Sequence, residues 1–429
     1  MIFFALGIFL LTYTLLIFRK FRGRIFPIWA SMIIGAALML ATLTISPVEA
    51  FRAIDFPVLA FLFGLLVINA GFEKSGLLEY IVISLLSRAK NVDRLVLGLV
   101  FGSGLLSAFL VNDGIALLLT PLALSISTKL KLVPKSLLIP VAFGITTGSA
   151  FTPIGNPQNL LVALNSGMPS PFSQFILYLL VPSLVSLLLI YYLSKLFFRK
   201  DYEVVQDYQK TAESLPDKSN AITDRGLAKL SAVILLLMLA TFVSVEIFPI
   251  LQSLGLTLGN IALSFGMLML ISSPRRLQLL LGMNWGILVF FAGMFVVMRA
   301  VWDSSIGSIL LSHLPIPHAA SRVESTYSIM TNSVLLSQVL SNVPFVQLYT
   351  YEMHALSFTS SSTIPWLTLA AGSTLAGNLT LLGAVSNVII LDSAEQRKQK
   401  AFSFVEFVKY GVVATALTCA VFFLFLAFV

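Results

Sequence analysis

Charged residues are scarce in this sequence. Lys, Arg, Asp and Glu together make up 11% of the 429 residues, whereas 58% are hydrophobic. A water-soluble domain carries about 25% charged residues, so a soluble globular protein is excluded. Apolar stretches of roughly 17 to 25 residues recur along the chain, and each can cross a hydrocarbon core as a helix. The short alternating segments of a membrane β-barrel are not seen.

Cysteine, histidine clusters and catalytic motifs are also lacking. The single cysteine, Cys419, cannot form a disulfide within the chain or build a cysteine metal cage. His313, His318 and His354 show no metal-ligand spacing and are interpreted as surface residues. There is no P-loop, HExxH or GxSxG motif. We therefore expect neither an enzyme nor a cofactor, and the chain cannot itself hydrolyse ATP.

The apolar runs predict an all-α polytopic membrane protein with ten spans and two interrupted hairpins. The first run has no basic residue before it and no small-residue cleavage site, which indicates a retained span. The hairpins, 95–128 and 326–356, each enter and leave on the same side. The expected spans are 2–18, 25–45, 56–72, 136–168 (broken), 172–198, 227–248, 254–271, 285–301, 364–391 (broken) and 404–428.

The net charge of +8 fits cationic loops of an inserted protein better than nucleic-acid binding. With the first loop placed in the cytoplasm, only Arg52, Arg299 and Arg322 of the 27 basic residues lie outside. This predicts a cell-membrane protein with both termini outside. Arg299 lies near the outer end of a span, where a long side chain can snorkel to the interface. Full spans in place of the hairpins would keep the same sidedness, so charge leaves that alternative open.

The longest polar stretch, 199–226, divides the chain into an N-terminal half, 1–198, and a C-terminal half, 227–429. We interpret it as a cytoplasmic linker, with a regulatory or docking role as the alternative.

The two halves carry the same motifs in the same order. LVND at 110–113 corresponds to LSNV at 340–343, in the middle of each hairpin. The pattern T-x-x-G-x-x-x-N follows at 152–159 and again at 380–387. The distance from hairpin Asn to loop Gly is 43 residues in the first half and 41 in the second. Corresponding spans begin on opposite sides, which predicts inverted repeats around a site near the bilayer midplane, as in many secondary transporters.

Asp113 is the one acid that the predicted topology places near the midplane. It follows Asn112 inside an otherwise apolar run. An ionisable group at that depth is costly and indicates function. It could take up and release a proton or stay ionised beside a bound cation. The structural alternative is an Asp that caps the second hairpin arm.

The stretch 152–159, TPIGNPQN, cannot form a regular helix, because Pro153 and Pro157 lack the N–H donor and Gly155 relaxes the backbone. Freed carbonyl groups can bind a cation. Freed amides and helix N-termini can bind an anion or a neutral oxyacid. Asn378 and Thr380 belong to the corresponding stretch of the second half. The alternative is a kinked helix whose amides are satisfied locally.

At these motifs the sequence resembles the ion transporter superfamily, which includes arsenite-efflux permeases, sodium/proton antiporters and divalent anion:sodium symporters. Segment 109–121, FLVNDGIALLLTP, is similar to the arsenite permease signature. Segments 149–159 and 336–344 are more similar to a bacterial and archaeal branch of anion permeases. The resemblance covers nearly the whole chain and is specific for the superfamily, not for the substrate.

The resemblance implies two re-entrant hairpins, broken helices behind them, and a central site between a scaffold part and a transport part. It also admits a homodimer and, for an arsenite permease, a separate ATPase subunit. Carried over by position, the residues expected to line the site are Asn112, Asp113, Gly155, Asn159, Asn342, Gly383 and Asn387. The candidate substrate- or ion-binding set is completed by Thr152, Asn156, Gln158, Ser341, Asn378 and Thr380.

The hairpin tips differ from those of the symporters, which have Ser-Asn-Thr at both tips. Here the tips read Val-Asn-Asp at 111–113 and Ser-Asn-Val at 341–343. Paired sodium sites and dicarboxylate transport are therefore not expected, and an acid at one tip fits proton coupling better. If the coupling ion is Na⁺ instead, it is expected near Asn112, Asp113 and Gly155.

These observations predict a secondary transporter that moves a small inorganic anion or oxyacid, with arsenite-like efflux coupled to protons through Asp113. The rivals are a sodium/proton antiporter and a sodium-coupled anion or dicarboxylate symporter; an ion channel is less favoured. The expected partners are the transported anion or oxyacid and the lipid bilayer, not nucleic acid.

Overall fold

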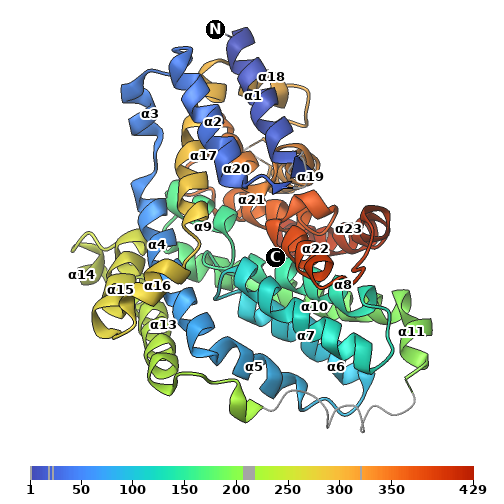
Figure 1. Ribbon diagram of the computed structural model, residues 1–429. Coiled ribbons are helices and arrows are strands. Elements are labelled where there is room, and N and C mark those ends of the chain that lie inside the picture. The colour runs from blue at the N-terminus through green and yellow to red at the C-terminus, as the bar shows by residue number, and fades with distance from the viewer. Residues whose placement is uncertain (1, 18–19, 22–23, 206–217, 319–320) are drawn as a thin grey trace.

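The computed structural model describes residues 2–17, 20–21, 24–205, 218–318 and 321–429 (Figure 1). The described chain is helical apart from two antiparallel strands of two residues each, β1 (Lys20–Phe21) and β2 (Arg24–Ile25). The predicted all-α class is confirmed. Of the predicted linker, residues 206–217 lie outside the described residues.

The first half contains α1 (Ile2–Ile17), α2 (Ile28–Ala41), α3 (Pro47–Ala53), α4 (Phe56–Ser75), α5 (Leu77–Leu86), α6 (Val92–Ser107), α7 (Asn112–Lys129), α8 (Lys135–Gly148), η1 (Ser149–Phe151), α9 (Pro157–Asn165) and α10 (Pro171–Phe197). The short α11 (Arg199–Glu203) and η2 (Lys218–Asn220) follow. The second half contains α13 (Arg225–Ile247), α14 (Pro249–Gln252), α15 (Leu258–Ser272), α16 (Arg276–Gly282), α17 (Trp285–Asp303), α18 (Ile306–Leu311), α19 (Arg322–Leu340), α20 (Asn342–Ala355), α21 (Thr363–Ala376), η3 (Leu381–Gly383), α22 (Val385–Gln396) and α23 (Phe404–Phe428).

The predicted interruptions are present. Both hairpins are pairs of helices, α6–α7 and α19–α20, with the Asn of each tip at the start of the second arm. Both broken spans are pairs of helices joined by a short 3-10 turn, α8–η1–α9 and α21–η3–α22. Among the described residues, five helices are long and apolar enough to cross a membrane, namely α4, α10, α13, α17 and α23. The predicted spans 2–18, 25–45 and 254–271 are shorter apolar helices, α1, α2 and α15.

Six short helices of the described chain lie outside the predicted spans and hairpins. They are α3, α5, α11, α14, α16 and α18. In α5, the buried residues Leu78, Val82, Ile83 and Leu86 form one face, as in an amphipathic helix. A helix of 10 residues is too short to span a bilayer, so a search for spans passes over it.

The two halves pack in matching ways. Helix α4 packs on α15, and its counterpart α17 packs on α2; likewise α6 packs on α8 and α19 packs on α21. The α4–α15 crossing and the α17–α2 crossing each depend on a glycine. A Cβ atom on Gly64 would collide with the backbone of Ala262, and one on the aligned Gly293 would lie 2.9 Å from the carbonyl carbon of Met32. The repeat therefore extends to individual contacts.

The repeats are inverted. Trp285, at the start of α17, packs against Phe63 in the middle of α4, with ring centroids 6.1 Å apart. Arg299, near the end of α17, lies close enough to Glu49 of α3 to interact with it electrostatically, and α3 precedes α4. The two helices therefore run in opposite directions, and Figure 1 shows α4 descending while α17 rises from α16 toward α18.

The packing agrees with the predicted sidedness of the loops. Glu246, in the last turn of α13, accepts hydrogen bonds from the backbone N–H groups of Phe172 and Ser173 at 2.7 and 2.8 Å, and all three lie at span ends predicted to face outside. Ion pairs between segments predicted to be cytoplasmic include Lys135–Glu406 at 2.7 Å, Lys195–Asp93 at 3.0 Å and Arg275–Asp224 at 3.0 Å. Helix ends that are predicted to lie on the same side of the membrane are therefore in contact. This agreement holds whichever compartment that side faces.

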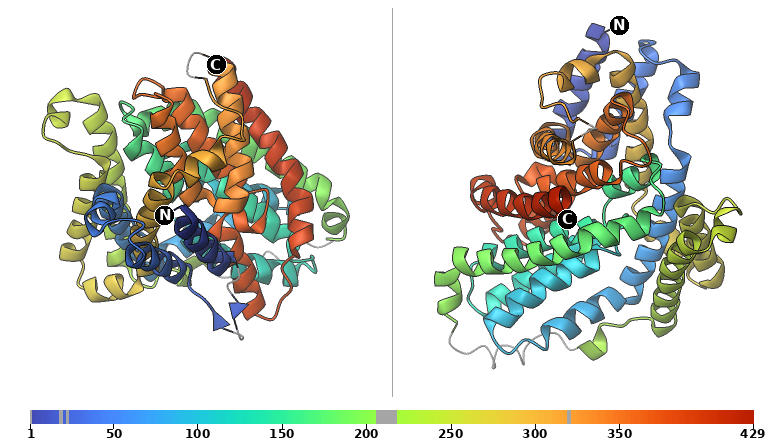
Figure 2. Two further views of the ribbon diagram at one scale, coloured as in Figure 1. Left: turned by 90° about the horizontal axis from the view of Figure 1, so that it is seen from above. Right: turned by 180° about the vertical axis from the view of Figure 1, so that it is seen from behind.

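The views in Figure 2 place α13 to α16 at one edge of the molecule, on the far side of α4 from the first hairpin. The central helix α4 contacts α13, α15, α16 and α17 and also α9 behind the first break. It therefore separates the edge helices from the hairpins and breaks.

Candidate functional site

One cavity lies where both hairpin tips and both broken helices meet. Its volume is about 330 Å³. Each of the four interruptions contributes three or more consecutive residues to its wall, and α1, α2 and α17 complete it. The interruption segments in the wall are 111–113, 156–158, 341–343 and 383–386. The structure thus brings together seven of the sequence-predicted site residues: Asn112, Asp113, Asn156, Gln158, Ser341, Asn342 and Gly383.

Four helices begin at this cavity: α7, α9, α20 and α22. In each of them the residues of the first turn belong to the wall. The first backbone N–H groups of a helix have no partner within the helix, and the helix dipole adds partial positive charge there. No side chain caps α7, α20 or α22, whereas Asn156 Oδ1 accepts from the Asn159 N–H of α9 at 2.9 Å. The cavity therefore receives positive potential from backbone alone.

The side chains of the described wall add little positive charge of their own. Asp113 is the charged residue among those described there, and Lys, Arg and His do not occur in that wall. Asn112 Oδ1 and Asn342 Oδ1 have no hydrogen-bond partner among the described residues, although Asn342 is only 4% exposed. Unsatisfied buried acceptors are uncommon, and both of these residues belong to the described cavity wall.

The cavity reaches the surface near the start of α2 and the start of α17. The wall residues Pro27, Trp29 and Asn284 are exposed there. They flank the loops in which the basic residues of 19–24 and 275–276 lie. The opening therefore faces the side that carries most of the positive charge.

The asparagines that close the two T-x-x-G-x-x-x-N motifs lie behind the loops and do not line the cavity. Asn159 Nδ2 donates to the carbonyl groups of Ser149, Ala150 and Thr152 at 3.0, 3.1 and 3.0 Å. Asn387 Nδ2 donates to the Gly377 carbonyl at 2.7 Å, and Gly377 occupies the position of Ser149 in the second repeat. Both side chains satisfy carbonyl groups that the helix breaks set free.

The threonines of the same motifs tie each break to its hairpin. Thr152 Oγ1 donates to the Ala108 carbonyl, and the Gly155 N–H donates to Thr152 Oγ1 at 3.0 Å. Thr380 Oγ1 donates to Gln338 Oε1 at 2.8 Å. Ala108 and Gln338 hold corresponding places in the two hairpins. Thr152 and Thr380 thus contact protein groups, and direct binding of a ligand by them remains a prediction.

The remaining predicted residues have mixed surroundings. Asn378 Nδ2 donates to Thr147 Oγ1 at 2.9 Å, and its Oδ1 has no partner among the described residues.

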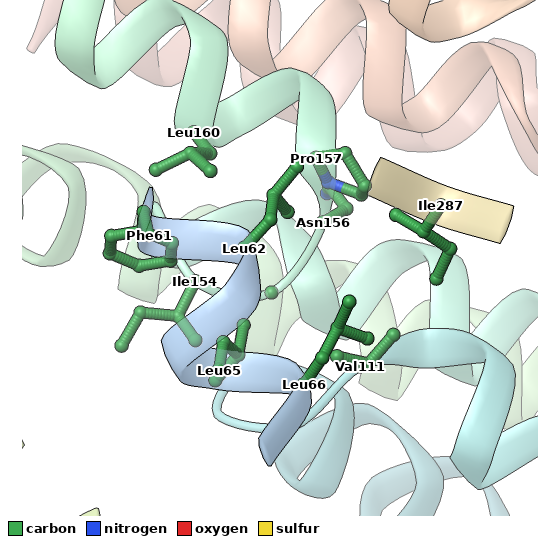
Figure 3. A pocket seen from close by; sticks show the side chains of 11 residues that line it. Phe61, Leu62, Leu65, Leu66, Val111, Ile154, Asn156, Pro157, Leu160 and Ile287 are labelled. Atoms are coloured by element: carbon green, nitrogen blue, oxygen red, sulfur yellow. The ribbon is translucent and has the colours of Figure 1, made fainter. Parts of the chain in front are cut away.

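Gly155 lines a second, apolar pocket of about 20 Å³ beside the main cavity. In Figure 3, Leu62 and Leu66 of α4 lie beside Asn156, Pro157 and Val111 there. Helix α4 therefore closes one side of the site with apolar side chains. Ligand binding by Asn159, Asn378 and Asn387 likewise remains a prediction.

A second acid lies beside Asp113, and the sequence analysis missed it. A Cβ atom on Gly114, the third residue of α7, would collide with Glu73 Oε1 of α4. Glu73 is close enough to Asp113 for the two carboxyl groups to interact electrostatically. Asp113 therefore has a second carboxyl group as a neighbour. The available signal was Asn69, which is polar, lies one turn before Glu73, and interrupts the end of an apolar span.

Asp113 does not serve as a helix cap. The residue at the cap position of α7 is Val111, and no side chain accepts from the first amides of that helix. The capping alternative is therefore wrong, and the position of Asp113 in the cavity wall needs another explanation.

Comparison with known proteins identifies the family. A family model described as "Citrate transporter" (CitMHS) matches residues 13–375, which include both hairpins and the first break. The chain belongs to this citrate transporter family. Relatives that are similar over 90% of both chains include the Uncharacterized transporter Rv2684 of Mycobacterium tuberculosis, which is 31% identical over 398 residues. The Silicon efflux transporter LSI3 of Oryza sativa subsp. japonica is 27% identical over 441 residues, which cover 91% of this chain and 90% of the relative.

Solved transporter structures share the fold of this citrate transporter family member. The YdaH transporter of Alcanivorax borkumensis superposes with a TM-score of 0.54 at 15% identity, covering 99% of this chain and 96% of that one. MtrF of Neisseria gonorrhoeae gives a TM-score of 0.51 at 13% identity, covering 99% and 97%. At such identities the likeness concerns the fold alone.

The chain is therefore a multi-pass membrane protein and a secondary transporter, not an enzyme. The predicted resemblance to the ion transporter superfamily is confirmed.

Proposed function

We propose that this transporter exports a small inorganic oxyacid or anion, of the arsenite or silicic acid type, in exchange for protons that bind at Asp113. The observation that carries the proposal is the cavity in which four helix N-termini meet one carboxyl group and no described cationic side chain. The cavity residues named above are the proposed binding residues.

The chemistry of the wall fits a compact molecule with several hydroxyl groups. Each helix N-terminus supplies roughly half a positive charge and free N–H donors, which suit the oxygens of an oxyacid. The amide side chains of Asn112 and Asn342 in the described wall add neutral donors and acceptors that suit its hydroxyl groups. A polycarboxylate such as citrate carries several negative charges, which proteins commonly bind with Arg or Lys. Arg and Lys do not occur in the described wall. We therefore favour a weakly charged oxyacid over citrate as the substrate.

A relative supports this substrate class. LSI3 is named a silicon efflux transporter, and dissolved silicon is a small neutral hydroxy acid, as arsenite is near neutral pH. The alternatives within transport are sodium/proton antiport and sodium-coupled anion symport.

The position of Asp113 suggests how proton and substrate are exchanged. An ionised carboxylate accepts a hydrogen bond from a substrate hydroxyl. A proton on that carboxyl group removes an acceptor, so proton and substrate compete for the same site, as exchange requires. Alternating access then carries one or the other through the two inverted repeats.

The test is uptake into inverted membrane vesicles with an imposed pH gradient, with arsenite, silicic acid and citrate as substrates. We expect gradient-driven uptake of the oxyacids and little uptake of citrate. In Asp113→Asn the gradient should no longer drive uptake, while Glu79→Gln, an exposed change on α5, should behave like the unaltered protein. Undiminished uptake in Asp113→Asn would overturn the coupling role, and a preference for citrate would overturn the substrate class.

We also propose that the protein lies in the cell membrane with both termini outside, since that orientation puts the basic loops in the cytoplasm. Short tags added at the ends should then be accessible to an antibody on intact cells. Accessibility only after permeabilisation would contradict this orientation.

A further inference from the structure

Glu73 lies next to Asp113 but outside the substrate cavity. Its carboxyl group packs against Gly114 in the first turn of α7. Asp113 belongs to the described cavity wall, and Glu73 does not. Glu73 is exposed to solvent, whereas Asp113 is only half-exposed. Asp113 in the first turn of α7 thus lies in the described cavity wall, and Glu73 of α4 is a second, more exposed acid next to it and outside that wall.

Asn69 connects to this pair and carries an unused acceptor. It lies on α4 one turn before Glu73, and its Nδ2 donates to Glu73 Oε1 at 2.8 Å. Asn69 is 6% exposed, and its Oδ1 has no hydrogen-bond partner among the described residues. A Cβ atom on Gly114 would lie 3.0 Å from Asn69 Nδ2 and 3.6 Å from Asn69 Oδ1. The unpartnered oxygen therefore points to the same small region as the Glu73 carboxyl group.

The charges around this region leave it negative. Lys74 also interacts electrostatically with Glu73, but its Cε packs against Gly282 of α16, away from α7. Glu73 is the described group that acts electrostatically on Asp113. Two carboxyl groups and an unused amide oxygen are ligands for a cation and leave no role for an anion.

We propose that Asn69, Glu73 and Asp113 form the binding site of the coupling cation, with access to solvent separate from the substrate cavity. The inference rests on the proposed function, which it deepens by adding Glu73 as the residue that exchanges the cation with solvent. The ligand is one monovalent cation held by two carboxyl groups, either a proton or Na⁺. One bound cation lowers the charge of the pair from two negative charges to one, and Asp113 passes that change to the substrate.

The experiment compares Glu73→Gln and Glu73→Asp with the control Glu79→Gln in vesicles. Two rates are measured for each protein: accumulation driven by a pH gradient or by a Na⁺ gradient, and substrate exchange without any gradient. We expect the ratio of driven accumulation to exchange to fall roughly tenfold in Glu73→Gln, within the range typical of coupling between two sites. Glu73→Asp should recover most of the ratio, because it restores a carboxyl group.

The gradient that drives the unaltered protein identifies the cation, since a proton site responds to pH and a sodium site to Na⁺. An unchanged ratio in Glu73→Gln under both gradients would overturn the proposal. So would an equal loss of exchange and accumulation in both Glu73 variants, which indicates a structural role.

A failure of the proposed function can be distinguished from a failure of the proposed cation site. If none of the oxyacids is transported, the cation site is still tested by the thermal stability of purified, substrate-free protein as pH and Na⁺ concentration are varied. A ligand that binds only the folded protein raises its stability with concentration. The response should be present in the unaltered protein and in Glu79→Gln and lost in Glu73→Gln; an identical response in all three would overturn the site.

Discussion

The two halves of this transporter present the same backbone to the cavity but different side chains. Each half supplies two helix N-termini. The first hairpin tip carries Asp113, where the second carries Val343. The asymmetry continues in α4 and α17, since Met298 and Trp302 occupy the positions aligned with Asn69 and Glu73. Under the proposed function, both halves offer helix N-termini to the substrate, whereas the side chains proposed to hold the cation lie in the first half.

The helix breaks differ in a second way. Asn159 donates to three carbonyl groups and accepts from Thr374 Oγ1 at 2.9 Å. Asn387 donates to one carbonyl group, and its Oδ1 has no partner among the described residues. The asparagine of the first break therefore makes more hydrogen bonds than the asparagine of the second.

The largest expected effect comes from moving the carboxyl group between the halves, in the double variant Asp113→Asn/Val343→Asp. We expect driven accumulation to stay about 100-fold below that of the unaltered protein, near the upper end of typical coupling. The reason is that α17 offers neither an amide nor a second carboxyl group at the aligned positions. Vesicle uptake under a pH gradient measures this, with Val343→Asp alone showing the cost of the added acid. Restored coupling in the double variant would contradict the claim that only the first half can hold the cation.

The next effect concerns stability. Asn159→Ala should lower the free energy of unfolding by roughly 3 kcal/mol, at about 1 kcal/mol for each hydrogen bond. The change removes two N–H donors, which three carbonyl groups share, and the acceptor of the Thr374 hydroxyl. The matched change Asn387→Ala should cost about 1 kcal/mol. Denaturant unfolding of both variants in detergent gives the two values. Equal losses would show that the breaks are held alike.

The smallest effect concerns the backbone of the hairpin tips. Ser341 has φ 62° and ψ 155°, a conformation that favours glycine, while the aligned Val111 has an ordinary φ of −64° and ψ of 127°. Ser341→Gly should raise stability by about 1 kcal/mol, and Val111→Gly should lower it by about 1 kcal/mol. Melting temperatures of the purified variants measure the shifts. A loss of stability in Ser341→Gly would contradict strain at this tip.

The interruptions could be predicted from sequence because polar and helix-breaking residues stand out in an apolar background. Asn112, Asn342 and the stretch 152–159 were found in this way, and all of them lie at the described cavity or directly behind it. Their proximity followed from inverted repeats, whose motifs are visible without a structure.

The orientation of individual side chains could not be predicted. Asn156 and Asn159 lie three residues apart in one break, yet only Asn156 contributes to the described cavity wall. Even so, Asn156 Nδ2 donates to Ser149 Oγ and Thr374 Oγ1, both at 3.0 Å, and Asn159 Nδ2 donates to carbonyl groups behind the loop. That difference depends on the path of the loop. Glu73 was missed for a related reason, because its contact with Gly114 arises from the packing of α4 on the first hairpin.

The most direct test of the central claim, a single cation site in the first half coupled to the substrate, is a count of protons released when substrate binds. Calorimetric titration of the purified protein with arsenite, in buffers that differ in ionisation enthalpy, gives this number. For a proton-coupled site, we predict proton release by the unaltered protein and none by Asp113→Asn or Glu73→Gln. The same release from all three proteins would contradict the account.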